Sequence, residues 1–177
     1  YIDDETPDAV TVTVGTGSNQ TNVDLYQNDL ITRCDNSCAL TDANLNTADG
    51  NGDTDITAIL SAASDSAITI ASGKSLFIPS SHTFAPGGTV SVGGNFTNNG
   101  TFTHGSSTVT LTGTSTQTLK TNSSSFYTLT QNGIGGTYTL QDALVVTGNL
   151  TITNGTLDTK SGSNYGITVG GNFSNAG

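Results

Sequence analysis

The sequence is poor in positive charge, in proline and in large apolar residues, and each shortage excludes a class of protein. Lysine and arginine together number 4 of 177 residues. Such a chain lacks the basic surface that binds phosphate backbones, so we exclude nucleic acid as a partner. It also lacks an apolar run long enough for a membrane-spanning helix, so we expect no membrane span. Prolines number 3 and charged residues make up 10%, whereas disordered chains are usually rich in both.

Threonine, serine, asparagine and glycine are abundant, and they alternate with valine, isoleucine, leucine and phenylalanine. An apolar share of 33% is low for a globular domain, so we expect ordered β-structure around a thin core. The formal net charge of −10 is uneven, because only Asp142 and Asp158 of the 14 acidic residues follow Asp65. This change in composition divides the chain into an acidic N-terminal region, residues 1–66, and a region of β-solenoid repeats, residues 67–177.

Cys34 and Cys38 are the only cysteines. Their spacing fits a small disulfide loop, and disulfides are typical of an oxidising, extracellular compartment. A zinc site would need further ligands nearby, and neither His82 nor His104 is close in sequence. The chain begins at Tyr1 rather than methionine, as expected of a mature product from which a targeting segment has been removed. We therefore predict an extracellular or cell-surface location.

One phrase recurs along the chain. The segment VGGNFTNNGT at 92–101 returns as VTGNLTITNGT at 146–156 and begins again as VGGNFSNAG at 169–177. The intervals of 54 and 23 residues fit a coil of roughly 23–27 residues, with an unmarked coil between the first two copies. Internal repetition on this scale is typical of a solenoid.

From Ala67 onward, short segments alternate a large apolar residue with threonine or serine, the pattern of a half-buried strand. We predict an all-β fold, a parallel β-helix (β-solenoid) with an irregular N-terminal region; a β-sandwich built from hairpins is the alternative. Outside the repeats we expect a strand over 9–14 and one short helix over 55–63. The residues expected to point into the coils are Val92, Phe96, Val109, Leu111, Leu129, Leu140, Val146, Leu150, Ile152, Val169 and Phe173.

The block GGNFTNNGTFT at 93–103 resembles the Thr/Gly/Asn-rich repeats of large bacterial surface and secreted proteins, including adhesins of the filamentous-haemagglutinin type. The resemblance covers about half of the chain, from about Gly87 to the end. It implies a β-solenoid of the adhesin or fibre-forming type, with an extracellular structural or adhesive role. It carries over no catalytic residue.

The segment DGNGDTDI at 49–56 is the sharpest local motif. Calcium takes about six to eight oxygen ligands, and alternate acidic positions on a tight loop supply them. The segment resembles the start of a calcium loop of the EF-hand or dockerin kind, with Asp49, Asn51, Asp53 and Asp55 as ligands and calcium as the expected cofactor. It departs from that pattern in having threonine at the sixth place and leucine at the twelfth. The alternative is an acidic turn in which Asp53 or Asp55 caps a short helix.

Seven Asn-x-Ser/Thr triplets are potential acceptors for N-linked glycans on exposed turns of a secreted protein. A chain this rich in asparagine, threonine and serine also produces such triplets by chance. Asn-Gly turns and stacked asparagine ladders then explain most of them structurally. The triplets begin at Asn19, Asn95, Asn99, Asn122, Asn149, Asn154 and Asn172.

Thr-x-Thr dyads are frequent, and flat ladders of such dyads on a β-solenoid resemble ice-binding proteins. Ice binding needs the dyads in register on one flat face, and their uneven spacing argues against that register. We expect threonine here to be the outward-facing residue of half-buried strands. The dyads are Thr11/Thr13, Thr101/Thr103, Thr108/Thr110, Thr110/Thr112, Thr116/Thr118, Thr128/Thr130, Thr137/Thr139 and Thr151/Thr153.

No nucleophile elbow and no paired carboxylates stand out, so we expect a protein that is not an enzyme. The sequence predicts an extracellular structural protein that forms or decorates a surface fibre. Assembly would proceed by end-to-end stacking or by donation of the strand 9–14 to a neighbour, so the expected partner is the chain itself. The alternatives are an adhesin segment that binds glycan or another surface and, less favoured, a β-helix carbohydrate-active enzyme or an ice-binding protein.

Overall fold

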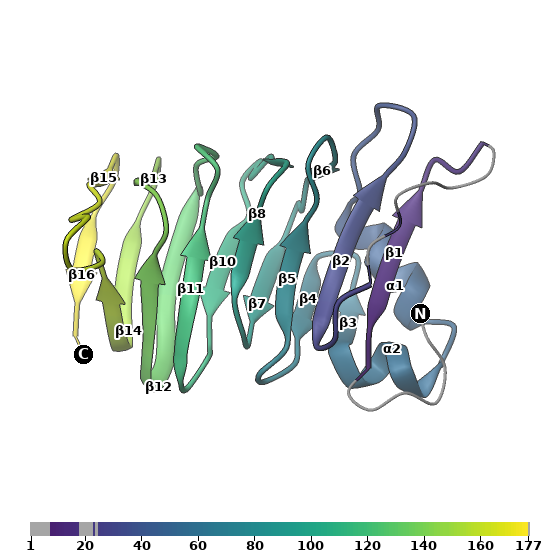
Figure 1. The fold of residues 1–177 in the computed structure, drawn as a ribbon, viewed down its shortest axis with the longest axis horizontal. Coiled ribbons are helices and arrows are strands. Elements are labelled where there is room, and N and C mark those ends of the chain that lie inside the picture. The colour runs from purple at the N-terminus through teal and green to yellow at the C-terminus, as the bar shows by residue number, and fades with distance from the viewer. Residues whose placement is uncertain (1–7, 18–22, 24, 177) are drawn as a thin grey trace.

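The chain winds into a β-solenoid whose strands follow one another along the long axis of the molecule (Figure 1). The computed structural model describes residues 8–17, 23 and 25–176. Apart from one antiparallel pair, every strand pair joins parallel strands of successive coils. The predicted parallel β-helix is therefore confirmed, and the β-sandwich alternative is set aside.

Each coil contributes to three faces, which we name A, B and C. Face A contains β1 (Val10–Val14), β2 (Asp29–Cys34), β5 (Ser75–Ile78), β8 (Phe96–Asn98), β11 (Thr116–Lys120) and the second halves of β12 (Thr128–Leu140) and β14 (Leu150–Asp158). Face B contains β3 (Leu60–Ser64), β4 (Ala67–Ile70), β7 (Thr89–Val92), β10 (Thr108–Leu111), the first halves of β12 and β14, and β16 (Phe173–Asn175). Face C contains β6 (Thr83–Phe84), β9 (Thr101–Phe102), β13 (Leu144–Val146) and β15 (Ile167–Val169).

The core is a set of apolar columns, one running along the inside of each face. On face B the successive members are 19 to 23 residues apart, because the turns absorb the difference in coil length. On face C the middle of the column is aromatic, and Phe102 lies against Phe126 with the ring centres 5.3 Å apart. The face B column consists of Ile68, Val90, Val109, Leu129, Leu150 and Phe173.

The recurring phrase marks a corner of the solenoid rather than a whole coil. Its first copy turns the chain from β7 on face B to β8 on face A, whereas the second and third copies turn it from face C to face B. Only these last two stack directly, with Val146 paired to Val169 and Leu150 to Phe173. The expected coil of 23–27 residues with an unmarked coil in between was therefore wrong. The same short sequence forms two different corners of the solenoid, so the interval between its copies does not measure the length of a coil.

Glycine is needed at these corners because the backbone of the preceding coil lies against them. A Cβ atom on Gly93 would lie 2.3 Å from the carbonyl oxygen of Ala71, and one on Gly170 would lie 2.4 Å from that of Thr147. Both distances are far below van der Waals contact, so any side chain would push two coils apart. The Gly-Gly pair therefore sets how closely successive coils approach at the turn.

The N-terminal region contains two helices rather than the single expected one, α1 (Asp42–Asp49) and α2 (Thr54–Ile59). The helix predicted over 55–63 ends early because Leu60 pairs with Ile70 and begins β3, the antiparallel strand. Burial of Leu60 in the sheet outweighs the helix propensity of the alanines that follow. The capping box of α1 was the missed signal, since the Thr41 N–H donates to Asn44 Oδ1 at 2.9 Å.

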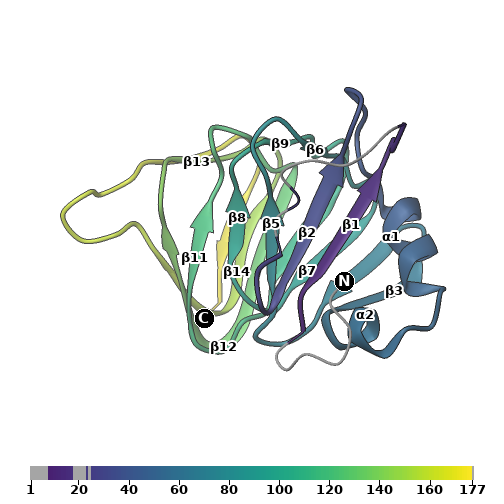
Figure 2. The same ribbon diagram turned by 45° about the vertical axis from the view of Figure 1, so that its right-hand side comes forward.

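The solenoid sheet runs without interruption across residue 66. β1 pairs with β2 in the same chain, Val10 lying opposite Leu30, and β2 pairs with β5. The predicted strand over 9–14 is thus present as β1 and is already paired within its own chain. Both helices lie at this N-terminal end of the molecule, beside β1 and β3 (Figure 2). Neither helix is long and apolar enough to cross a membrane, and no other helix occurs among the described residues.

Candidate functional site

The two ends of the solenoid differ in how its apolar core is covered. At the N-terminal end, α1 and α2 bury Leu45, Ile56 and Ile59 in continuity with the core. Asp42 at the start of α1 fastens this cap, because its Oδ2 accepts hydrogen bonds from the N–H groups of Gly87 and Gly88 at 2.9 and 2.8 Å. Burial raises the pKa of this carboxyl, against the opposing effect of the two N–H donors. This end is closed.

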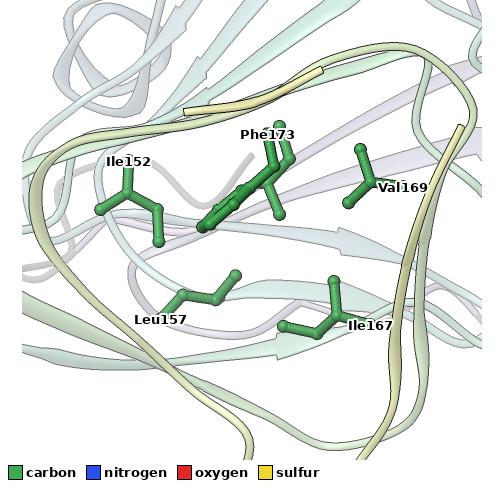
Figure 3. A pocket seen from close by; sticks show the side chains of 6 residues that line it. Ile152, Leu157, Ile167, Val169 and Phe173 are labelled. Carbon is green, nitrogen blue, oxygen red and sulfur yellow. The ribbon is translucent and has the colours of Figure 1, made fainter. Parts of the chain in front are cut away.

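The C-terminal end is open. Six apolar residues surround a hollow of about 470 Å³, into which the labelled side chains point (Figure 3). Phe173 is 59% exposed and Ile167 38% exposed, although the residues that stack on the same columns one coil earlier, Leu150 and Leu144, are almost completely buried. We call this set the open end; it consists of Leu150, Ile152, Leu157, Ile167, Val169 and Phe173.

The open end explains why some residues that we expected inside the coils are not buried. Eight of the eleven residues expected inside the coils are buried, from Val92 to Leu150. Ile152 and Val169 are only half-buried and Phe173 is exposed, because no further coil covers them in the described part of the chain. Their side chains still face the hollow (Figure 3), so their direction agrees with the prediction and their burial does not.

Asparagine side chains tie each corner to the coil above it. Asn95 Oδ1 accepts from the Thr118 N–H at 2.8 Å, and Asn149 Oδ1 accepts from the Asn172 N–H at 2.9 Å. Each bond joins residues 23 positions apart, one coil to the next. Asn172 occupies the same corner position as Asn149, since the residues that follow the two asparagines pair with each other. The Asn172 amide is therefore placed to receive the N–H of a following coil.

Tyr138 is a buried residue that links neighbouring coils by hydrogen bonds, and the sequence analysis did not single it out. Its hydroxyl lies 2.8 Å from the carbonyl oxygen of Gly94 and 3.0 Å from that of Val92, and it accepts from the Gly113 N–H at 3.2 Å. One side chain thus links three segments that are separate in sequence. Burial raises its pKa to about 12, against the opposing hydrogen bond from Gly113. A tyrosine at an inward position of a strand was the available signal, because a buried hydroxyl needs partners.

The proposed calcium ligands run from the last residue of α1, Asp49, across the connection to Asp55 in the first turn of α2. Asp49 Oδ2 accepts from the Ala62 N–H at 2.9 Å, and Asp53 is the N-cap of α2, its Oδ1 accepting from the Asp55 N–H at 3.0 Å. Asn51 is exposed on the turn. Among the described residues, no three acidic, histidine or cysteine side chains converge as a metal site would need. The helix-capping alternative is confirmed, and calcium stays a prediction.

Cys34 and Cys38 form the predicted disulfide, with their Cα atoms 5.5 Å apart. The bridge closes a loop at the end of β2.

An ion pair lies in the same loop, where Asp35 meets Arg33 with a shortest N–O distance of 3.0 Å. The hydrogen bond from this guanidinium lowers the pKa of the Asp35 carboxyl. His82 Nδ1 lies 2.8 Å from the carbonyl oxygen of Cys34, whereas His104 Nδ1 bonds locally to that of Gly105.

Most of the sequon asparagines take part in contacts between coils. Asn99 Oδ1 accepts from Lys120, Asn122 Nδ2 donates to the Gly100 carbonyl, and Asn154 Nδ2 donates to Asn132 Oδ1. Asparagine stacks on asparagine, as the sequence led us to expect, at Asn132 with Asn154 and at Asn149 with Asn172. Among the described residues, the other sequon asparagines bond to different residues of the neighbouring coil, and glycosylation stays a prediction. Asn19 lies outside the described residues.

The outward threonines fall into register, contrary to the expectation drawn from their uneven spacing. On face B, Thr108 and Thr110 lie directly opposite Thr128 and Thr130 of the next coil. On face A, Thr116 and Thr118 lie opposite Thr137 and Thr139. Spacing along the sequence varies because turn lengths differ, and pairing between coils restores the register.

Comparison with protein-family models, with curated proteins and with solved structures finds no match for this chain. The β-solenoid fold is therefore established by the strand pairing of the chain itself. Kinship with bacterial surface adhesins is not shown, and the function has to be inferred from the open end and the outward faces.

Proposed function

We propose that this chain is a structural segment of an extracellular rod, and that its open end stacks against a further β-solenoid coil. The observation that carries the proposal is the open end itself. Apolar surface in contact with water is unfavourable by about 25 cal/mol per Å², and a coil laid on this end would remove from water the apolar side chains of the open end other than Leu150, which is already buried. It would also pair the free edges of β14, β15 and β16.

The chemistry of the open end fits a coil of the same kind. A following coil with an apolar residue above Phe173 would continue the face B column, and its backbone N–H would meet Asn172 as Asn172 itself meets Asn149. Such a coil comes from further repeats in the same polypeptide, whereas a second copy would instead cover the hollow with its own open end. The disulfide supports an extracellular location, since it is stable in an oxidising compartment.

The closed N-terminal end limits how copies of this chain combine. α1 and α2 cover that end of the core with Leu45, Ile56 and Ile59, although β1 and β3 are still the terminal strands of the sheet there. We therefore expect two identical chains to meet through their open ends, an isologous contact that closes as a dimer. Under this proposal a longer rod is built from additional coils in one polypeptide.

Sedimentation velocity of the 177-residue chain, from micromolar to millimolar concentration, tests this proposal. We expect a monomer–dimer equilibrium that Phe173→Lys shifts to monomer, because a buried, unpaired charge would oppose the contact. Ile134→Lys is the matched control, since Ile134 is 74% exposed but does not line the hollow, and it should dimerise as the native chain does. A native chain that stays monomeric at millimolar concentration, or dimers that survive Phe173→Lys, would overturn the proposal.

A further inference from the structure

Face B carries a two-dimensional array of hydroxyl groups. In the first column, successive strands place a threonine or serine directly opposite one another over six coils. In the second column, three threonines stand two residues earlier on neighbouring strands. We call these nine residues the hydroxyl array: Thr69, Ser91, Thr110, Thr130, Thr151 and Ser174 in the first column, and Thr89, Thr108 and Thr128 in the second.

The array faces outward because its neighbours in sequence form the inward column. Val109 lies between Thr108 and Thr110 and is completely buried, as Leu129 is between the two threonines of the next coil. Side chains alternate across a strand, so the residues on each side of a buried one point outward. Thr69, Thr89 and Ser174 are exposed, and the other six members of the array are half-buried between their neighbours. The strands that carry the array, from β4 to β16, follow one another along the molecule (Figure 1).

The hydroxyls of the array are free to bond outward. None of the nine takes part in a side-chain hydrogen bond with the part of the chain that the structure describes. The next threonine along β10 is different, since the hydroxyl of Thr112 donates a hydrogen bond to the carbonyl oxygen of Val92. Threonine is restricted at χ1, which favours the same hydroxyl and methyl positions on neighbouring strands.

The array is neutral and has no aromatic rings. All nine members are threonine or serine, and the inward residues between them are aliphatic except for Phe173. Face A is different, because Lys120 lies beside Thr97 and Asp158 beside Thr139. A surface that holds sugar rings usually offers an aromatic platform or charged and amide groups at a few points. Face B instead repeats one neutral group at regular intervals.

Those intervals follow from strand geometry. Strands in a sheet are about 4.8 Å apart, and residues i and i+2 of one strand are about 6.7 Å apart. The array therefore repeats about every 4.8 Å across the strands, and its two columns are about 6.7 Å apart along them. These two spacings are similar to those between water molecules on a prism face of ice. We propose that face B binds ice, with the threonine hydroxyls hydrogen-bonded to an ordered water layer and the methyl groups fitting between its molecules.

This inference does not depend on the assembly of the open end, because the open end is formed by inward-facing residues at one terminus of the solenoid, whereas the array is formed by outward-facing residues along face B. Partition of the purified chain into slowly growing ice tests it directly. We expect the native chain to be enriched in the ice fraction and to slow recrystallisation of fine-grained ice. Thr110→Lys/Thr130→Lys places two adjacent cations in the centre of the array and should reduce enrichment to that of a protein without ice affinity.

Thr116→Lys/Thr137→Lys is the matched control, because it makes the same change to two directly opposed threonines on face A. It should bind ice as the native chain does, and circular dichroism should show both variants folded. A native chain excluded from ice, or equal loss in both variants, would overturn the proposal. Binding to crystalline cellulose or chitin without enrichment in ice would overturn it too and would assign the array to a polysaccharide surface.

Discussion

The buried hydroxyl of Tyr138 offers a sharp test of how the coils are held together. Tyr138→Phe removes one oxygen atom and leaves the ring in the core. The Gly113 N–H and the Gly94 carbonyl would then lose the only partners that the described part of the chain shows for them. Val92 would keep a partner, since its carbonyl also accepts from the Thr112 N–H at 2.9 Å.

The magnitude follows from these two orphaned groups. A buried polar group left without a partner costs about 1–3 kcal/mol, so two such groups should lower the free energy of unfolding by about 2–6 kcal/mol. For a chain of this length that corresponds to a fall in Tm of roughly 5–20 °C. Tyr127→Phe is the control, because Tyr127 is 44% exposed, and its substitution should change stability by less than about 0.5 kcal/mol.

Urea unfolding followed by circular dichroism measures both variants, and pH adds a second readout. The pKa of Tyr138 is raised from 10.0 to about 12 in the folded chain, so the folded state keeps a proton that the unfolded state loses between these values. The free energy of unfolding of the native chain, measured against Tyr138→Phe, should therefore fall as pH rises from 10 to 12. Equal urea midpoints for the native chain and Tyr138→Phe at neutral pH would refute the conclusion that the Tyr138 hydroxyl stabilises the contact between neighbouring coils.

Two further predictions concern the N-terminal cap. Burial raises the pKa of Asp42 above 3.8, so the folded chain holds this proton more tightly than the unfolded chain. Measured by urea unfolding, the free energy of unfolding of the native chain should therefore fall relative to that of Asp42→Asn as pH rises from 3.5 to 7. A rise would show that the hydrogen bonds from Gly87 and Gly88 dominate. If the loop from Asp49 to Asp55 binds calcium, a chelator should lower the Tm of the native chain and leave that of Asp49→Ala/Asp53→Ala unchanged. An unchanged Tm of the native chain would remove calcium from the description.

Local patterns in the sequence determined the parts of the fold that depend on local rules. Alternation of apolar residues with threonine predicted the strands and the burial of residues such as Val109 and Leu129, because the side-chain period of a strand is two. The recurring phrase was what favoured a parallel β-helix over a β-sandwich. Two cysteines separated by four positions predicted their own bridge. The acidic run offered a capped helix as the alternative to a calcium loop, since Asp53 needs only the next turn of backbone to act as an N-cap.

Relations between coils were decided only by the tertiary structure. A turn can gain or lose residues without moving the strand that follows, so the sequence interval of 54 residues hid the change of corner, and uneven dyad spacing hid the register of Thr110 with Thr130. Pairing of Leu60 with Ile70 ended α2, although the local sequence favoured a longer helix. Phe173 points inward as the sequence predicted, but its burial requires a further coil above it, so the local pattern could not decide it. Each of these outcomes depends on which backbone is stacked above and below, and that neighbour is about 20 residues away along the chain.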